Sequence, residues 1–70
     1  MQLIQTFPDG KTFYFYNDDL HREDGPAVEY PDGRKYWLLH GEAYVFSRYL
    51  EKLSETKSDK EIFLLRLKYG

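Results

Sequence analysis

A chain of 70 residues is one domain, near the lower limit at which an apolar core alone can stabilise a fold. There is no cysteine, which excludes disulfides and thiolate metal sites, and seven Tyr, five Phe and one Trp make aromatic packing the main source of stability. The formal net charge is -2, with eight acids and four bases in residues 1–44 but four acids and six bases in residues 45–70. Neither part has the dense basic patch of a nucleic-acid-binding protein, so we expect no nucleic-acid partner.

One segment occurs twice. Residues 7–11, Phe-Pro-Asp-Gly-Lys, return 23 residues later as Tyr-Pro-Asp-Gly-Arg at residues 30–34. Residues 13–16 and 36–39 keep bulky side chains under the same shift. Similarity at a fixed period of this size is typical of a repeated supersecondary unit.

Each copy predicts a β-hairpin. Residues 3–7 are β-prone, and the Pro-Asp-Gly sequence that follows suits a tight turn. Residues 12–16 are then the returning strand, and residues 27–30 and 35–39 form the same pair of strands in the second copy. Residues 17–19 form a turn, and residues 20–26 are too polar and too interrupted to be a regular strand, so we expect the chain to change direction there.

After residue 44 the periodicity becomes helical. The residues that recur on one helical face are Val45, Phe46, Tyr49, Leu50 and Leu53. Residues 54–57 are a polar connector, and Ser58 with Glu61 fits a capping box that favours a second helix over residues 59–69. A strand would also fit this segment, because one set of alternate residues is Phe63, Leu65, Leu67 and Tyr69 and the other is Leu64, Arg66 and Lys68. Helix and strand therefore both stay open for it.

The predicted fold is α+β: a four-stranded antiparallel meander of two β-hairpin repeats followed by one or two C-terminal α-helices. Residues 1–70 form a single domain, with the hairpin repeats in residues 1–44 and a helical cap in residues 45–70. We expect no membrane span and no signal peptide, because no run of about 18 apolar residues occurs and the first residues lack a basic segment.

Both faces of this sheet are predicted to be apolar, because successive side chains of a strand point to opposite faces. One face carries Phe13, Phe15, Tyr36 and Leu38. The other carries Tyr14, Tyr16, Trp37 and Leu39. Two short helices can cover one face, and the second is left either with tyrosine hydroxyls in water or with an aromatic binding surface.

Residues 21–27, His-Arg-Glu-Asp-Gly-Pro-Ala, are the most distinctive segment. His21 lies near carboxylates, but no second cluster completes a catalytic site, so we expect no enzymatic activity and no cofactor. His21 and His40 lack further ligands at metal-binding spacing, so we expect no metal. We interpret the segment as the turn between the two copies, with His21 and Arg22 packed beside it.

These residues resemble a MORN-type repeat, and more closely the bacterial and phage variant written approximately as D-G-x-x-x-W-x-x-x-G-x-x-H-R-x-x-G-P-A. The resemblance covers residues 3–44, almost two copies of 23 residues. It implies stacked β-hairpins with a binding or scaffold role and without enzymatic activity, sometimes in antitoxin-like or phage accessory proteins. Asp18 stands where this pattern has glycine, and residues 42–45 lack the expected His-Arg, so the array is predicted to stop there.

We therefore predict a small non-enzymatic protein–protein interaction module, a phage or bacterial accessory or inhibitor protein that binds a host protein through an aromatic sheet face and acidic loops. The predicted apolar anchors are Tyr14, Tyr16, Trp37 and Leu39. The predicted polar rim is Asp18, Asp19, Glu23 and Asp24. The alternative is a protein that binds or sequesters a small anionic, nucleotide-like ligand through His21, Arg22 and Arg34.

The expected partner is a protein, and self-association into a homo-oligomer is left open because the chain is so short. The predicted location is the cytoplasm, which is the host cytoplasm if a phage encodes the protein.

Overall fold

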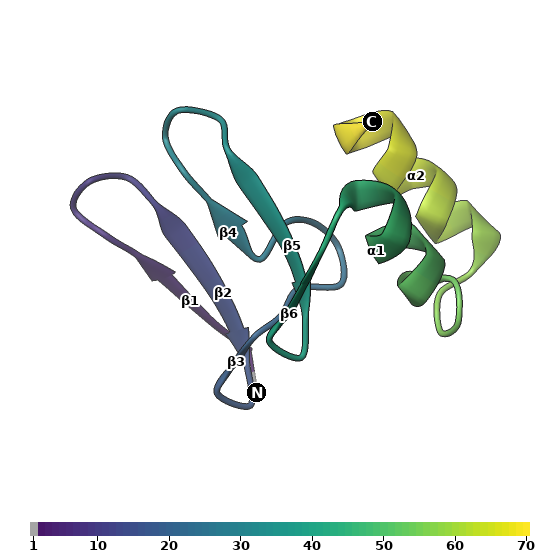
Figure 1. Ribbon diagram of the computed structural model, residues 1–70, viewed down its shortest axis with the longest axis horizontal. Coiled ribbons are helices and arrows are strands. Elements are labelled where there is room, and N and C mark those ends of the chain that lie inside the picture. The colour runs from purple at the N-terminus through teal and green to yellow at the C-terminus, as the bar shows by residue number, and fades with distance from the viewer. Residues whose placement is uncertain (1) are drawn as a thin grey trace.

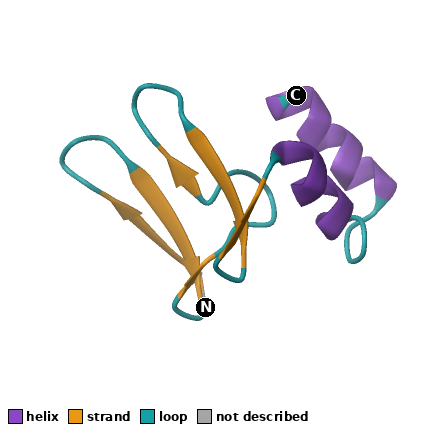
Figure 2. Cartoon of the chain, viewed as in Figure 1, coloured by secondary structure: helices purple, strands orange, loops and turns teal. Residues whose placement is uncertain are grey.

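The computed structural model describes residues 2–70 as an antiparallel sheet with two helices packed at one end (Figure 1). Within these residues the elements are β1 (Gln2–Thr6), β2 (Thr12–Tyr16), β3 (Asp19–Leu20), β4 (Val28–Glu29), β5 (Lys35–Leu39), β6 (Glu42–Tyr44), α1 (Phe46–Leu53) and α2 (Asp59–Tyr69). The strand order is β1-β2-β4-β5-β6, with β3 paired to β2. The predicted α+β class is confirmed, and the sheet has two short strands more than the four we expected (Figure 2).

The 23-residue repeat is visible in the backbone, since β2 and β5 are equivalent strands one period apart. In both copies the aromatic residue before the turn donates its backbone N–H to the carbonyl of the base after it, at 2.9 Å: Phe7 to Lys11 and Tyr30 to Arg34. The turn aspartate accepts the backbone N–H of the same base in both copies, at 3.2 and 3.0 Å. The two hairpins therefore share their hydrogen bonds as well as their sequence.

A second tight turn also repeats, and it explains the two additional strands. Asn17 and Asp18 have φ values of 49° and 70°, and their equivalents His40 and Gly41 have 51° and 81°. Two consecutive positive φ values define the hairpin turn whose twist suits antiparallel strands. β3 and β6 follow these turns. The positive φ of Asp18 also gives the reason why glycine would be favoured at that position.

The strand register divides the side chains between the faces as their alternation predicted. Phe13 lies opposite Val28, and Val28 lies opposite Tyr36, so all three point to one side of the sheet. We call the side that carries Phe13, Phe15, Tyr36 and Leu38 the phenylalanine face. We call the side that carries Tyr14, Tyr16, Trp37 and Leu39 the tryptophan face.

Two helices follow the sheet. Residue 45 caps α1 without a side-chain hydrogen bond, and α1 buries Tyr49, Leu50 and Leu53. At the start of α2 the hydroxyl of Ser58 accepts the N–H of Glu61 at 3.3 Å, as the capping box predicted. Residues 59–69 are a helix and not a strand, with the buried pair Ile62 and Leu65 three residues apart on one helical face.

Both helices pack on the tryptophan face and form the main core there. The ring of Trp37 lies 4.6 Å from that of Phe46, 5.0 Å from Tyr49 and 5.1 Å from Tyr69, measured between ring centres. The other members of this core are Leu50, Leu53, Ile62 and Leu65. A smaller cluster contains Ala27, Val28 and Leu38, with Phe13, Leu20 and Tyr30 partly buried against it. Neither helix in residues 2–70 has the length and apolar character needed to span a lipid bilayer.

Candidate functional site

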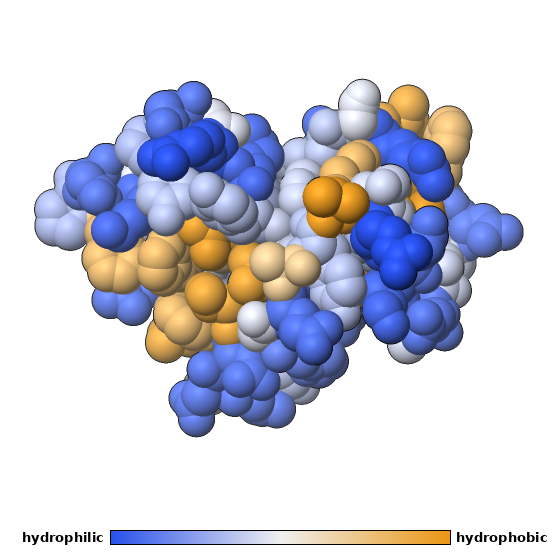
Figure 3. All heavy atoms as spheres, in the orientation of Figure 1, coloured by the Kyte–Doolittle hydropathy of each residue, from blue (hydrophilic) through white to orange (hydrophobic). Residues whose placement is uncertain are grey.

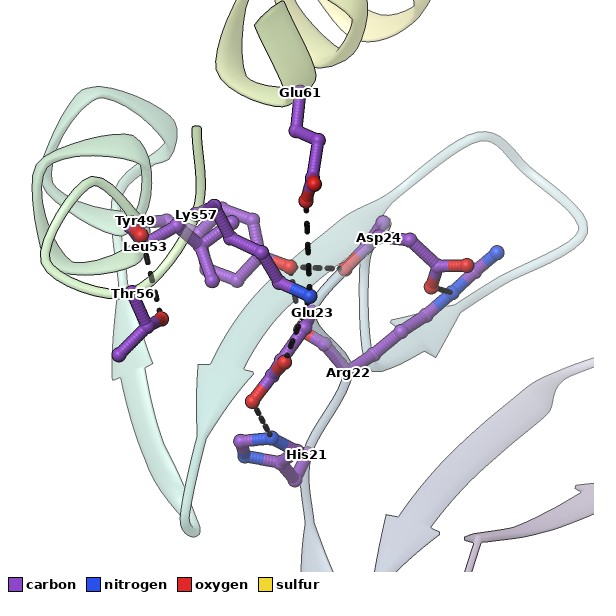
Figure 4. Close-up of polar contacts among 10 residues, drawn as sticks. His21, Arg22, Glu23, Asp24, Tyr49, Leu53, Thr56, Lys57 and Glu61 are labelled. Carbon is purple, nitrogen blue, oxygen red and sulfur yellow. Dashed lines mark hydrogen bonds and ion pairs between the residues drawn. The ribbon is translucent and has the colours of Figure 1, made fainter. Parts of the chain in front are cut away.

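The loop formed by residues 21–27 lies where the sheet meets the helices, and side chains from both contact it (Figure 4). His21 is 5% exposed. Its Nδ1 accepts the backbone N–H of His40 at 2.9 Å, and its Nε2 lies 3.1 Å from a carboxylate oxygen of Glu23. Because Nδ1 is an acceptor, the hydrogen-bond network assigns the ring proton to Nε2, which donates to Glu23. Both ring nitrogens of His21 are therefore used within the chain.

Arg22 is also held within the chain. Its guanidinium donates to Asp24 at 2.9 Å, to Glu29 at 2.8 Å and to the carbonyl of Pro26 at 3.2 Å. The same group lies 4.0 Å from the centre of the Tyr14 ring, where a cation is attracted to the aromatic face. Burial alone would lower the pKa of Arg22, but the hydrogen bond to Asp24 and other nearby groups raise it above its usual value. The side chain stays charged, and its Nε and Nη1 donors are occupied.

Tyr49 fixes α1 to the backbone of the same loop. Its side chain is completely buried, and its hydroxyl donates to the carbonyl oxygens of Arg22 and Gly25, at 2.9 Å for Gly25. Burial raises the pKa of Tyr49, so the hydroxyl keeps its proton and remains a donor. Sequence reasoning placed Tyr49 on an apolar helical face but had no signal for the two carbonyls that its hydroxyl reaches.

Lys57, in the connector between the helices, makes a further link to the loop. Its ammonium lies 3.1 Å from the carboxylate of Glu23 and 3.8 Å from that of Glu61 (Figure 4). The hydrogen bond from Lys57, together with that from His21, lowers the pKa of the Glu23 carboxyl. The motif of residues 21–27 is thus a polar junction that joins the two repeats to the helical cap.

We expect Glu23 to make the stability of the fold depend on pH in the acid range. A carboxyl whose pKa is lowered by folding stabilises the protein above its usual value of 4.5, and this contribution is lost as the pH falls through the folded value. Because this side chain is 45% exposed, Glu23→Gln should reduce the free energy of unfolding by only roughly 0.5 kcal/mol near pH 7. Urea unfolding of both proteins near pH 7 and near pH 3 measures the difference, which should be smaller at the lower pH. A difference that is equal at both pH values would contradict the assignment.

Trp37 and Leu39, predicted as anchors of an exposed surface, belong to the core instead. Trp37 is 9% exposed, and Leu39 is half-buried against the same cluster. The physical reason is that α1 follows β6 almost directly and lays its apolar side on this face. One face of the sheet is covered by helices, as expected, but it is the face that we expected to stay open.

The other predicted partner-binding residues are not all brought together, although Tyr16, Glu23 and Asp24 line one hollow. Tyr14 is half-buried under the guanidinium of Arg22, whereas Tyr16 is 43% exposed and its ring lies 5.7 Å from that of His21. The acids of the predicted rim are exposed but separate into a pair at the β2–β3 turn (Asp18, Asp19) and a pair in the junction loop (Glu23, Asp24). A role of these residues in binding a partner stays a prediction.

The three residues predicted to bind an anion are not brought together either. Arg34 lies in the turn between β4 and β5, where its guanidinium pairs with Asp32 at 2.8 Å and lies 4.6 Å from the centre of the Tyr30 ring. A hollow of about 370 Å³ is lined by His21 and Arg22 but not by Arg34. In the part of the chain that the structure describes, no group of three His, Cys, Asp or Glu residues is placed to hold a metal ion.

The surface that sequence reasoning missed is the outer edge of β1. All five residues of this strand are exposed, and β1 pairs with β2 on one edge. None of the other strands in residues 2–70 pairs with its second edge. The available signal was the position of residues 3–7 in the first of the two copies, because β1 is then the outermost strand among the described residues.

The geometry defines a small α+β domain in which two stacked hairpin repeats are closed at one end by two helices. Comparisons of this chain with protein-family models, with curated proteins and with solved structures find no match. The resemblance to MORN-type repeats therefore stays a prediction, and a function has to be inferred from the surfaces themselves.

Proposed function

We propose that this chain is a non-enzymatic protein-binding module that adds an extended segment of a partner protein to the outer edge of β1. The proposal rests on a difference between the two copies: the outer edge of the first strand is paired with another of the described strands in the second copy but not in the first copy. β1 and β4 begin the two copies, so their edges are equivalent. β4 lies between β2 and β5, whereas β1 has β2 on one side and none of the described strands on the other.

The hydrogen-bond pattern identifies the backbone groups that β1 offers. Phe7 donates its N–H to Lys11, and in an antiparallel pair the bonded positions alternate along the strand. The groups that point away from β2 therefore belong to Gln2, Ile4 and Thr6. One period later, the equivalent of Thr6 is Glu29, which is paired with Thr12 of β2. The chain itself thus contains an example of the pairing that we propose for a partner.

β1 lacks the features with which exposed strand edges usually avoid pairing. Its sequence, Gln-Leu-Ile-Gln-Thr, has neither a charged residue nor a proline. Leu3 is 60% exposed and Ile4 is 57% exposed, and they point to opposite faces of the sheet. A strand added at this edge would therefore find an apolar neighbour on each face, in addition to backbone hydrogen bonds.

The occupant that fits this edge is an extended segment with apolar or aromatic side chains on both of its faces, similar to β2 itself. An apolar area extends over the strands in the view of Figure 3. A hollow of about 490 Å³ beside β1 is lined by Gln2, Leu3, Gln5, Phe15, Asn17 and Asp18. Apolar side chains of the partner would enter this hollow on the phenylalanine face, and Asp18 at its rim favours a basic residue in the same segment.

We expect Ile4→Pro to abolish this binding and to leave the fold intact. Proline removes an N–H that points away from β2, so the β1–β2 hydrogen bonds are kept while one bond to the partner is lost. Peptides selected from a random display library on the wild-type protein should contain apolar or aromatic residues at consecutive positions. Their affinity, measured by fluorescence anisotropy, should fall at least about tenfold for Ile4→Pro.

The matched control is Ile4→Val, which keeps both the N–H and an apolar side chain and should bind within about twofold of the wild type. Fluorescence of Trp37, which is remote from this edge, reports whether each variant is folded. Selected peptides that bind Ile4→Pro as tightly as the wild type would overturn the proposal.

The second candidate function, capture of a small anionic ligand, is not favoured by any contact described above, because His21, Arg22 and Arg34 are each engaged by carboxylates of the chain itself. The resemblance to MORN-type repeats, which implies a binding or scaffold role, supports the same class of function as the free edge. We keep a phage or bacterial accessory protein as the proposed biological setting.

A further inference from the structure

The outer side of α2 is apolar although the core does not use it. Phe63 is 59% exposed, Leu64 is 52% exposed and Leu67 is 68% exposed. At about 3.6 residues per turn these three side chains form one stripe on the side of the helix opposite Ile62 and Leu65, which are buried. A surface helix normally carries polar residues on its outer side, so this stripe has the character of an interface.

Charged residues lie along both sides of this stripe in a particular order. Asp59 and Arg66 lie on the side next to Phe63, and Glu61 and Lys68 lie on the side next to Leu64. Each side therefore has an acid in the first turn of the helix and a base in the last turn. Among the ion pairs of residues 2–70, none involves Asp59, Arg66 or Lys68.

We propose that two copies of this chain associate through α2, with the two helices antiparallel and related by a twofold axis. In such a pair each side of one helix faces the same side of the other. If Phe63 lies opposite Leu64 of the partner subunit, Asp59 comes within two residues, or about 3 Å along the axis, of Arg66 of the partner subunit. Glu61 has the same relation to Lys68 of the partner subunit. Every flanking charge then meets its opposite.

The charges also exclude the parallel arrangement. In a parallel pair the side that carries Asp59 and Arg66 would face the side that carries Glu61 and Lys68 of the other copy. Acids would then lie against acids and bases against bases, which is unfavourable. Lys60, at the end of the stripe, would lie near Leu67 of the partner subunit, where its methylene groups cover apolar surface and its ammonium reaches water. The order of charges on α2 thus fits a second copy in one orientation.

The dimer would be weak and would leave β1 accessible. One short helix from each copy covers less than the roughly 800 Å² per partner of a standard interface, so the expected dissociation constant is on the order of 100 µM. β1 and α2 lie at opposite ends of the molecule (Figure 1). A dimer formed through α2 would therefore present two β1 edges, which would increase its avidity for a partner that contains two binding segments.

Sedimentation equilibrium of the wild-type protein from about 10 µM to about 1 mM tests the dimer. Leu67→Lys should be monomeric throughout this range. Leu3→Lys changes an equally apolar and similarly exposed residue on β1 and should dimerise as the wild type does. If Leu3→Lys abolished association and Leu67→Lys did not, the copies would pair through the β1 edge and the α2 dimer would be rejected.

Charge reversal tests the orientation. Asp59→Lys and Arg66→Glu should each weaken the homodimer about fivefold, because two symmetry-related attractions become repulsions. An equimolar mixture of the two variants restores both opposite-charge contacts and should form a heterodimer with at least the wild-type affinity. A mixture that sediments as the sum of its two components would overturn the antiparallel arrangement, and a wild-type protein that stays monomeric up to about 1 mM would overturn the dimer itself.

Discussion

Trp37→Ala is expected to unfold a large fraction of the protein at room temperature. The side chain contacts the rings of Phe46, Tyr49 and Tyr69, which come from both helices, so its removal leaves a cavity where the sheet and the cap meet. Truncation of a buried tryptophan costs about 3–5 kcal/mol. That loss is comparable to the whole stability of a domain of this size, on the order of 5 kcal/mol.

Tyr36→Ala provides the control, because Tyr36 precedes Trp37 on β5 but points to the open face and is 44% exposed. It should cost about 1 kcal/mol or less. Far-UV circular dichroism during urea titration follows both variants without depending on tryptophan fluorescence. Equal midpoints for the two variants would mean that the helices are not held through Trp37.

Tyr49→Phe should destabilise the junction between the repeats and the cap by about 1–3 kcal/mol, with nearly no change in apolar packing. The variant removes the hydroxyl that donates to the carbonyls of Arg22 and Gly25, and Gly25 is buried, so an acceptor is left without its donor. We expect lower urea midpoints and faster amide hydrogen exchange in residues 21–27, because the loop is released from α1.

Tyr44→Phe is the matched control for this variant. The hydroxyl of Tyr44 donates to Glu42 at 2.7 Å in an exposed position, where water replaces it, and its loss should cost less than about 0.5 kcal/mol. If the two variants had the same stability and the same exchange rates in the loop, the buried hydroxyl of Tyr49 would not be an anchor of the junction.

Local chemistry was sufficient to predict the hairpins and the first helix, and it favoured the second helix without excluding a strand. The Pro-Asp-Gly turns, the alternation of bulky residues and the cap at Ser58 act within a few residues, and the structure confirms each of them. β3 and β6 were not predicted, because their residues are few and partly polar. They depend on the positive φ values of the preceding turns. Asn17 and His40 begin these turns, and neither residue type predicts a positive φ as glycine does.

The polar junction was predicted in part. The interpretation of residues 21–27 as the turn between copies agrees with the contacts of His21 and Arg22. The partners that hold it from the other side are distant along the chain: Tyr49 is 24 residues from Gly25, and Lys57 is 34 residues from Glu23. No local pattern connects them. Contacts at such separation are visible only after the helices have folded back on the sheet.

The sequence by itself determined that this protein consists of two hairpin repeats and a helical tail, that both faces of its sheet are apolar, and which residues share a face. Only the tertiary structure decided which face is buried. Both faces offered similar apolar area, so the hydrophobic effect alone did not discriminate between them. The short connection from β6 to α1, and the hydroxyl of Tyr49 reaching the carbonyl of Gly25, selected the side of Trp37. The same choice left the phenylalanine face without a helix over it, and it left the edge of β1 and the outer stripe of α2 exposed. The proposed interactions rest on these surfaces.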